Sequence, residues 1–251
     1  NIELVSSRKI PPELHKRIQE ISPDLIMSIY YRQIIPPSIF NIPTGGAFNV
    51  HPSLLPKYRG PIPTMWAIEN GEKEFGVTIH KIDKGIDTGD IAFQEKHPVF
   101  EDDTGYTLYV KAMNIGAKML GRHFNDLLEG NYELKKQKGV GSYFGKYRSK
   151  EMINWVQPAE KVRDFIRARA KPFNTAQSPL LNSYVFIDKA TVVRSEKYPA
   201  QLPGKILDVL NDEILIVSCA EGCLRLDDYK LYPPLNETEK NVYLRQGVAF
   251  G

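Results

Sequence analysis

The sequence predicts an α/β domain followed by a small β domain. Residues 24–30 (DLIMSIY) form a continuous apolar run, as expected for a strand buried in a parallel sheet. Residues 104–129 carry apolar side chains at helical spacing, which predicts a long amphipathic helix. From residue 184 onward the chain contains five short apolar runs separated by turn residues, a pattern typical of a small β-barrel.

The first domain combines strands with helices whose starts are marked by proline or by polar caps. Pro11-Pro12 and Pro61 mark helix starts, because a proline is tolerated in the first turn. Gly45-Gly46 turns the chain into a strand, and Asp102-Asp103-Thr104 caps the long helix. The predicted elements are a helix at 11–21, strands at 24–30 and 47–50, a helix at 61–70, strands at 77–82 and 91–99, and a helix at 104–129.

A polar, glycine-punctuated and aromatic stretch separates the two domains. It contains VGSYFGKYRSKEMINW and is interpreted as a linker. The predicted division is therefore a first domain at 1–138, a linker at 139–157 and a second domain at 158–251. Pro158 opens a further helix that runs to Ala170. The short strands that follow it are predicted at 184–187, 191–194, 204–210, 213–218 and 223–226.

The composition is that of an ordinary globular protein. Of the 251 residues, 42% are hydrophobic and 25% are charged. The net charge of +3 is too small to indicate nucleic acid binding by itself. No apolar run approaches the roughly 18 residues needed to span a bilayer, and no signal peptide is evident at the start.

Both cysteines lie in one short stretch, SCAEGC, which is typical of a hairpin. A zinc site would need about four ligands, and no histidine lies near Cys219 or Cys223. We interpret the two as reduced structural thiols of a cytoplasmic protein, and we expect no metal. The sequence leaves the oligomeric state open.

Three polar side chains between residues 47 and 90 are candidates for shared chemistry. Asn49 and His51 stand two positions apart in a strand, so their side chains lie on one face. Asp87 lies in the turn DKGIDTG, just after another strand. If the two strands are neighbours whose C-terminal ends meet, the three groups converge where open α/β sheets place their sites. Taken singly, each also fits a plain role as a turn cap, a surface histidine or a turn aspartate.

An amide, an imidazole and a carboxylate suit the transfer of an acyl group to an amine. The attacking amine must be neutral, so a group must accept its proton, and the tetrahedral intermediate carries an oxyanion that needs hydrogen-bond donors. Asn49 can donate from its amide, and His51 can donate or shuttle a proton. Asp87 can orient His51, raise its basicity and hold the amine.

Two longer motifs carry a resemblance to a known family. NVHPSLLPKYRG (49–60) and GVTIHKIDKGIDTGDI (76–91), joined by a short helix, resemble the folate-dependent formyltransferases. That family includes methionyl-tRNA formyltransferase, glycinamide ribonucleotide transformylase and the amino-sugar N-formyltransferases. Its catalytic Asn-x-His matches Asn49-Val50-His51, and the second acid of its D-x-G-x-D-x-G loop matches Asp87.

The resemblance is close over residues 25–130 and looser elsewhere. It implies a Rossmann-like catalytic domain followed by an OB-like C-terminal β-barrel. It also implies a further βαβ segment ahead of Asn1, which is expected to be missing from this chain.

The co-substrate that the resemblance implies is 10-formyltetrahydrofolate, used without a metal. In the family, the loop after the first strand cradles the pterin, whereas a plain connecting loop is the alternative here. The family's SLLP-x-x-[RK]-G loop matches residues 53–60. The expected cofactor-binding residues are Arg32, Gln33, Ile34, Ile35, Ile82, Asp83, Gly85 and Ile86, and the expected substrate-loop residues are Ser53, Leu54, Lys57, Tyr58 and Arg59.

For the amine acceptor we favour a nucleotide-linked amino sugar. The loop RGPIPTMWAIENGE departs from the RGAAPIQ-like form of methionyl-tRNA formyltransferases, and GSYFGKYRSKEMINW resembles the tyrosine-rich linker of the sugar enzymes. From Lys150 onward 14 Lys and Arg balance 13 Asp and Glu, whereas a tRNA-binding domain is expected to be more basic. Candidates for stacking on a base, with core packing as the alternative, are Tyr106, Tyr143, Phe144 and Tyr147.

Methionyl-tRNA is the main alternative acceptor. Methionyl-tRNA formyltransferase carries an OB-like C-terminal domain, as do some sugar enzymes. Arg163, Arg167 and Lys171 recur at every fourth position, which predicts a basic helix face that either contacts phosphates or is simply solvated. Two weaker alternatives are a hydrolase that splits the formyl donor with water and a folate-binding module without catalysis.

Overall fold

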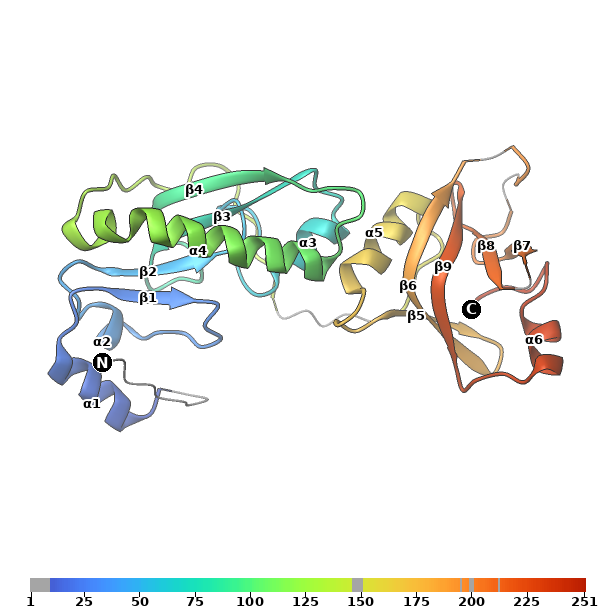
Figure 1. The fold of residues 1–251 in the computed structure, drawn as a ribbon, viewed down its shortest axis with the longest axis horizontal. Coiled ribbons are helices and arrows are strands. Elements are labelled where there is room, and N and C mark those ends of the chain that lie inside the picture. The colour runs from blue at the N-terminus through green and yellow to red at the C-terminus, as the bar shows by residue number, and fades with distance from the viewer. Residues whose placement is uncertain (1–9, 146–150, 195, 199–200, 212) are drawn as a thin grey trace. The chain divides into compact units, whose positions relative to one another are not determined.

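The fold contains two sheets, each in a different part of the chain (Figure 1). The structure is a computed structural model that describes residues 10–145, 151–194, 196–198, 201–211 and 213–251. The chain divides into two compact units. Unit 1 comprises Asn1–Pro63, Phe75–His97 and Lys111–Gly145, and unit 2 comprises Thr64–Glu74, Pro98–Val110 and Lys146–Gly251.

The helices and strands predicted for the first half of the chain are confirmed, with ends that move by one to three residues. The long helix begins just after the predicted Asp-Asp-Thr cap and ends at Glu129, before the glycine expected to stop it. The helices are α1 (Pro12–Ile21), α2 (Pro37–Phe40), α3 (Pro63–Glu69) and α4 (Gly105–Glu129), and the strands, which pair in chain order, are β1 (Ile26–Ile29), β2 (Ala47–His51), β3 (Glu74–Lys81) and β4 (Ile91–Pro98).

The first sheet is mixed, so the expectation that the strands of the site meet at their C-terminal ends is wrong. β1 and β2 are parallel, but β2 and β3 are antiparallel, with Asn49 opposite His80. The C-terminal end of β3 therefore lies opposite Phe48, near the start of β2. Apolar periodicity indicates which face of a strand is buried but not the direction of its neighbour.

Helix α4 packs on the first sheet through a glycine. A Cβ atom added at Gly116 would stand 2.9 Å from a methyl carbon of Val50 on β2 and 3.6 Å from one of Val77 on β3. The glycine therefore allows the helix backbone to approach both strands closely. No helix in the described part of the chain combines the length and the apolar character needed to cross a membrane.

The second sheet confirms the predicted small antiparallel β domain, but the bounds of its strands differ from the predicted ones. The runs predicted at 184–187 and 191–194 are one long strand with irregular pairing between Ile187 and Ala190. A strand at 176–180 was not predicted, and it lies at the edge of the sheet, where its proline is tolerated. In the order of their pairing the strands are β5 (Ala176–Leu180), β6 (Ser183–Val193), β9 (Cys223–Tyr232), β8 (Ile214–Ser218) and β7 (Ile206–Leu210). Helix α5 (Ala159–Arg169) precedes these strands in the chain, and helix α6 (Glu237–Tyr243) follows them.

The core of unit 2 includes the end of the predicted linker. Trp155 is buried, stacks on Phe250 with ring centroids 5.2 Å apart, and donates from Nε1 to the hydroxyl of Ser178 at 2.9 Å. Ile153 belongs to the same buried cluster. Thus Ile153 and Trp155, at the end of this stretch, belong to a folded core.

The prediction of a free basic face on α5 is wrong. Arg163 and Arg167 both donate to one oxygen of Asp164, each at 2.8 Å. Arg167 is buried and donates from Nη1 to the backbone carbonyl of Asp103 at 2.9 Å, inside unit 2. Lys171 is paired with an aspartate of β6. Helical spacing alone could not show that the two arginines point toward buried acceptors.

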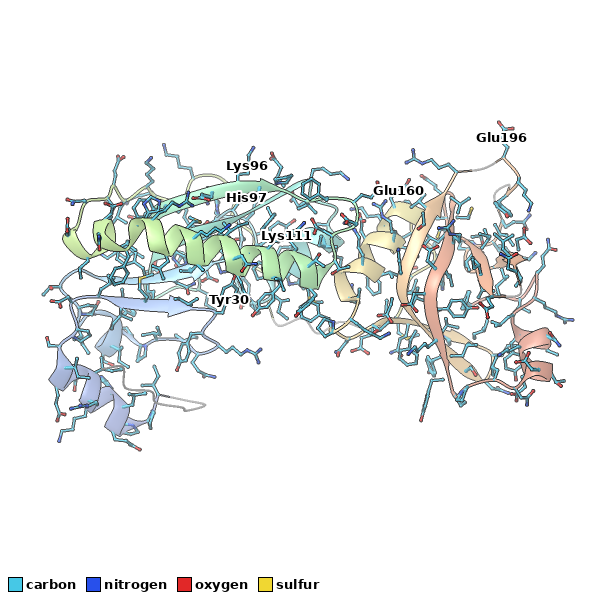
Figure 2. The ribbon with its side chains drawn as sticks, viewed as in Figure 1. Tyr30, Lys96, His97, Lys111, Glu160 and Glu196 are labelled. Atoms are coloured by element: carbon cyan, nitrogen blue, oxygen red, sulfur yellow. The ribbon has the colours of Figure 1, made fainter. Side chains whose placement is uncertain are left out.

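We expect Asp164→Ala to lower the free energy of unfolding by about 3–5 kcal/mol, because it leaves a buried arginine without its carboxylate. The side chains of Asp164 and Arg167 are only 6% and 10% exposed. A matched control on the same helix is Glu160→Ala. Glu160, labelled in Figure 2, is 45% exposed and pairs with an exposed Arg194, so its loss should cost less than about 1 kcal/mol. Denaturant unfolding of both variants checks the difference, and equal midpoints would contradict it.

Candidate active site

Asn49, His51 and Asp87 come together at the end of β2. The amide nitrogen of Asn49 donates to Oδ1 of Asp87 at 3.3 Å. Nδ1 of His51 lies 3.5 Å from Oδ2 of the same carboxylate. Strand alternation puts the first two side chains on one face of β2, and the loop after β3 turns back to bring Asp87 to them. The structure thus joins the three groups, although not by the strand arrangement that the sequence suggested.

The carboxylate of Asp87 is held ionised in a largely buried position. Burial alone would raise its pKa, but the contacts with His80 and His51 and a hydrogen bond from the Gly60 amide (2.8 Å) lower the pKa to about 2. The backbone of Asp87 has φ of +54°, a left-handed conformation that residues other than glycine rarely adopt. Asp87 is therefore a fixed negative charge at neutral pH.

His51 presents an unprotonated nitrogen to this charge. Its Nε2 lies 2.9 Å from the backbone carbonyl of Tyr58, and a carbonyl only accepts, so Nε2 carries the hydrogen. In the neutral ring, Nδ1 is then free of hydrogen where it faces Asp87. Burial lowers the pKa of His51 and outweighs the effect of Asp87, which raises that pKa as expected.

His80 is a further member of the site, which the sequence motifs did not single out. It stands opposite Asn49 on β3, is 2% exposed, and donates from Nδ1 to the carbonyl of Lys81 at 2.8 Å. Its Nε2 lies 3.3 Å from the Asn49 amide nitrogen and 3.5 Å from Oδ1 of Asp87. The signal in the sequence is a histidine within the apolar run VTIHKI, but its significance depends on the register with β2.

The substrate loop at 53–60 is held by contacts within the loop and by contacts with the distant segment that contains Ser142 and Phe144. Ser53 is buried and donates to the carbonyl of Lys57, while Tyr58 is buried and stacks on Phe144 with centroids 5.2 Å apart. A Cβ atom at Gly60 (φ +94°) would stand 2.3 Å from the carbonyl oxygen of Phe144, so only glycine fits there. Of the five residues expected to contact substrate, Lys57 is exposed, Leu54 and Arg59 are partly exposed, and Ser53 and Tyr58 are buried.

The expected cofactor residues lie in two loops that leave β1 and β3. Arg32, Gln33 and Ile34 are exposed and Ile35 partly so, in the loop that follows β1. The Ile82 amide donates to the carbonyl of Ala47, which places the other loop at the start of β2. Asp83 supports this second loop, since its Oδ1 accepts from the Gly85 amide at 2.9 Å and from the Thr88 hydroxyl at 2.7 Å. Gly85 and Ile86 are exposed.

The arrangement supplies what an acyl transfer to an amine needs. It places an amide donor and a neutral imidazole with a free nitrogen each within 3.5 Å of a fixed carboxylate. In the described residues, no group of three or more His, Cys, Asp and Glu side chains could hold a metal ion.

Comparison with known proteins identifies the family. Residues 3–123 match the formyl transferase family, and residues 147–232 match the formyl transferase C-terminal domain. A methionyl-tRNA formyltransferase from Caldanaerobacter subterraneus subsp. tengcongensis is 39% identical over 222 residues, which cover 88% of this chain and 70% of that protein. The chain belongs to the formyl transferase family. The resemblance stated from the two motifs is thereby confirmed, and the protein is an enzyme of this folate-dependent class.

The solved structures that resemble this formyltransferase include sugar N-formyltransferases. A sugar N-formyltransferase from Shewanella sp. FDAARGOS_354 is 31% identical with a TM-score of 0.62, and the match covers 71% of this chain and 75% of that one. WlaRD, a sugar 3N-formyltransferase solved in the presence of dTDP and 5-N-formyl-THF, is 27% identical with a TM-score of 0.66, over 86% and 77% of the two chains.

Proposed function

We propose that this formyltransferase transfers the formyl group of 10-formyltetrahydrofolate to a primary amine, with Asn49, His51 and Asp87 as the catalytic residues. The observation that carries the proposal is the convergence of these three side chains on one point at the end of β2. The folate donor is supported by WlaRD, which was solved with 5-N-formyl-THF.

The course of the reaction follows from the protonation states in the site. The neutral amine attacks the formyl carbon, a new C–N bond forms, and the Asn49 amide turns a hydrogen from Asp87 or His80 to the oxyanion. Nδ1 of His51 takes the proton that the amine loses. The imidazolium is then held between Asp87 and the Tyr58 carbonyl. When the bond from the formyl carbon to N10 breaks, the same proton passes to N10.

The proposed donor pocket uses the two loops expected from the family resemblance. The exposed apolar side chains of Ile34 (77% exposed) and Ile86 (42%) would wall the pterin, and neighbouring backbone would hydrogen-bond it. We further propose a cytoplasmic enzyme. Both cysteines are free and buried, and burial raises the pKa of the Cys219 thiol to about 12, as suits unreactive structural thiols.

As acceptor we propose a nucleotide-linked amino sugar. The arginines of α5 that could have contacted tRNA phosphates are engaged with Asp164 and with backbone carbonyls. The backbone of Tyr143 forms an isolated β-bridge with Arg59 of the substrate loop, and the residue is 56% exposed. Its ring is therefore available to stack on a base. Phe144 is instead packed on Tyr58, and Tyr147 lies outside the described residues. The sugar enzymes among the solved structures support the same acceptor class.

A second candidate acceptor is methionyl-tRNA. It is favoured by the 39% identity to a methionyl-tRNA formyltransferase across most of this chain. Phosphate contacts dominate the affinity of proteins for nucleic acid, so the two acceptors differ in their response to salt.

We expect a side-by-side formylation assay to give product with amino-sugar nucleotides and no release of formate when the amine is omitted. The assay compares methionyl-tRNA with a panel of such nucleotides, using 10-formyltetrahydrofolate as donor. The KM for the preferred acceptor should change little between about 50 and 200 mM salt, whereas a tRNA substrate would lose affinity steeply. Formylation of methionyl-tRNA alone would overturn the sugar proposal. Formate release that ignores added amine would indicate a hydrolase, and folate binding without turnover a binding module.

A further inference from the structure

The side chain of Gln137 connects the Asp87 loop to the substrate loop, all within unit 1. Its amide nitrogen donates to the carbonyl of Asp87 at 2.9 Å and to the carbonyl of Gly89 at 2.8 Å. Its amide oxygen accepts two hydrogen bonds from the guanidinium of Arg59, at 3.1 and 2.7 Å. Both hydrogens and both lone pairs of the amide are therefore in use.

These contacts fix a residue whose backbone is strained. Asp87 has φ of +54°, and a residue in the left-handed region keeps that conformation only where its surroundings hold it. Gln137 holds the carbonyl of Asp87, while the Gly60 amide holds its carboxylate at 2.8 Å. Since Gly60 follows Arg59 directly, Gln137 anchors the carboxylate from both the loop that carries it and the loop that caps it.

We propose that Gln137 is a positioning residue for formyl transfer that acts through Asp87. Its hydrogen bonds go to the carbonyls of Asp87 and Gly89 on one loop and come from Arg59 on the other, and both loops hold this carboxylate, so its effect on the chemical step passes through the placement of Asp87. Displacement of a catalytic group by about 1 Å can cost about 10²-fold in rate even when the change lies away from the reacting atoms. The inference rests on the proposed catalytic role of Asp87.

Two variants distinguish the hydrogen bonds that the Gln137 amide accepts from Arg59 from those that it donates to Asp87 and Gly89. Gln137→Ala removes all four hydrogen bonds. Gln137→Glu keeps an acceptor for Arg59 but sets a carboxylate against the carbonyls of Asp87 and Gly89. Lys136→Ala, at the exposed neighbouring position, is the matched control.

The decisive experiment is a double-mutant cycle with Asp87→Asn, measured by steady-state kinetics of formyl transfer on the full chain with the acceptor that the formylation panel identifies. Gln137→Ala and Gln137→Glu should each lower kcat by about 10–100-fold and leave the KM for the folate donor within about threefold. In the Asp87→Asn background, the same changes should cost less than about threefold more, because the group they position is already disabled.

Each outcome of the cycle is informative. Wild-type kcat in both Gln137 variants would overturn the inference, and so would equal losses with and without Asp87, since that pattern indicates a general structural role. If Gln137→Ala fails to fold, the Gln137→Glu arm gives the same test. A wild-type enzyme that formylates no acceptor would overturn the proposed function itself, and the wild-type measurement alone reveals that case.

Discussion

Asp87→Asn is expected to lower the rate of formyl transfer by about 10²–10⁴ without loss of the fold, because it removes a positioned charge and little else. An asparagine has the shape of the aspartate and keeps an oxygen for the Gly60 amide. It cannot stabilise a protonated His51, whose Nδ1 lies 3.5 Å from the carboxylate. Single-turnover kinetics measures the rate, and fluorescence titration with the folate measures binding, which should be retained.

The pKa of Asp87 sets a second expectation for the same variant. Because that pKa is lowered to about 2, the wild-type carboxylate stays ionised throughout the neutral range, and the loss on substitution should not depend on pH there. Asp102→Asn, at an exposed position, is the control, because it removes the charge of an aspartate away from the site. Near-normal turnover in Asp87→Asn would mean that another carboxylate serves the reaction. Asp83 is the next candidate by sequence, although it is engaged within its own loop.

Asn49→Ala should lower kcat by about 10²–10³, the usual effect of deleting one hydrogen-bond donor to an oxyanion. The substitution also removes the contacts that the amide makes with Asp87 and His80, both at 3.3 Å. We therefore expect the loss in kcat to exceed any change in the KM for the amine. Steady-state kinetics with both substrates varied separates the two effects.

The matched control for Asn49→Ala is Asn131→Ala, whose side chain is exposed and bonds to Glu129 only locally. That variant should behave as wild type. An unchanged kcat in Asn49→Ala would contradict the proposed donor, and a change confined to the KM would indicate a role in binding alone.

The sequence predicted long elements better than strand pairing. Helix α4 was predicted almost to the residue, because its apolar spacing, polar cap and terminal glycine agree. β6 was read as two strands because Asp188 and Lys189 interrupt its apolar pattern where the pairing is irregular. β5 was missed because AQSPL lacks alternation and contains a proline. The antiparallel direction of β3 could not be read from either strand alone.

The site shows the same division between local and long-range information. Asn49, His51 and Asp87 could be singled out from motif and residue type, but the contacts of His80 and Gln137 depend on how distant segments meet. The α5 arginines were misread for a related reason. Their spacing fixes a common helix face, but only tertiary packing decides whether that face meets solvent or buried acceptors.

The packing of α5 bears on how the chain folds as it is synthesised. The segments at 64–74 and 98–110 belong to unit 2, although they leave the ribosome long before α5, whose Arg167 bonds to the second of them. The carbonyls of residues 100, 101 and 103 therefore stay without this guanidinium until the second half of the chain has emerged. A fragment that begins after residue 146 has the opposite defect, because its arginine lacks those carbonyls. A cut between the two regions that match the family, 3–123 and 147–232, would therefore remove part of unit 2.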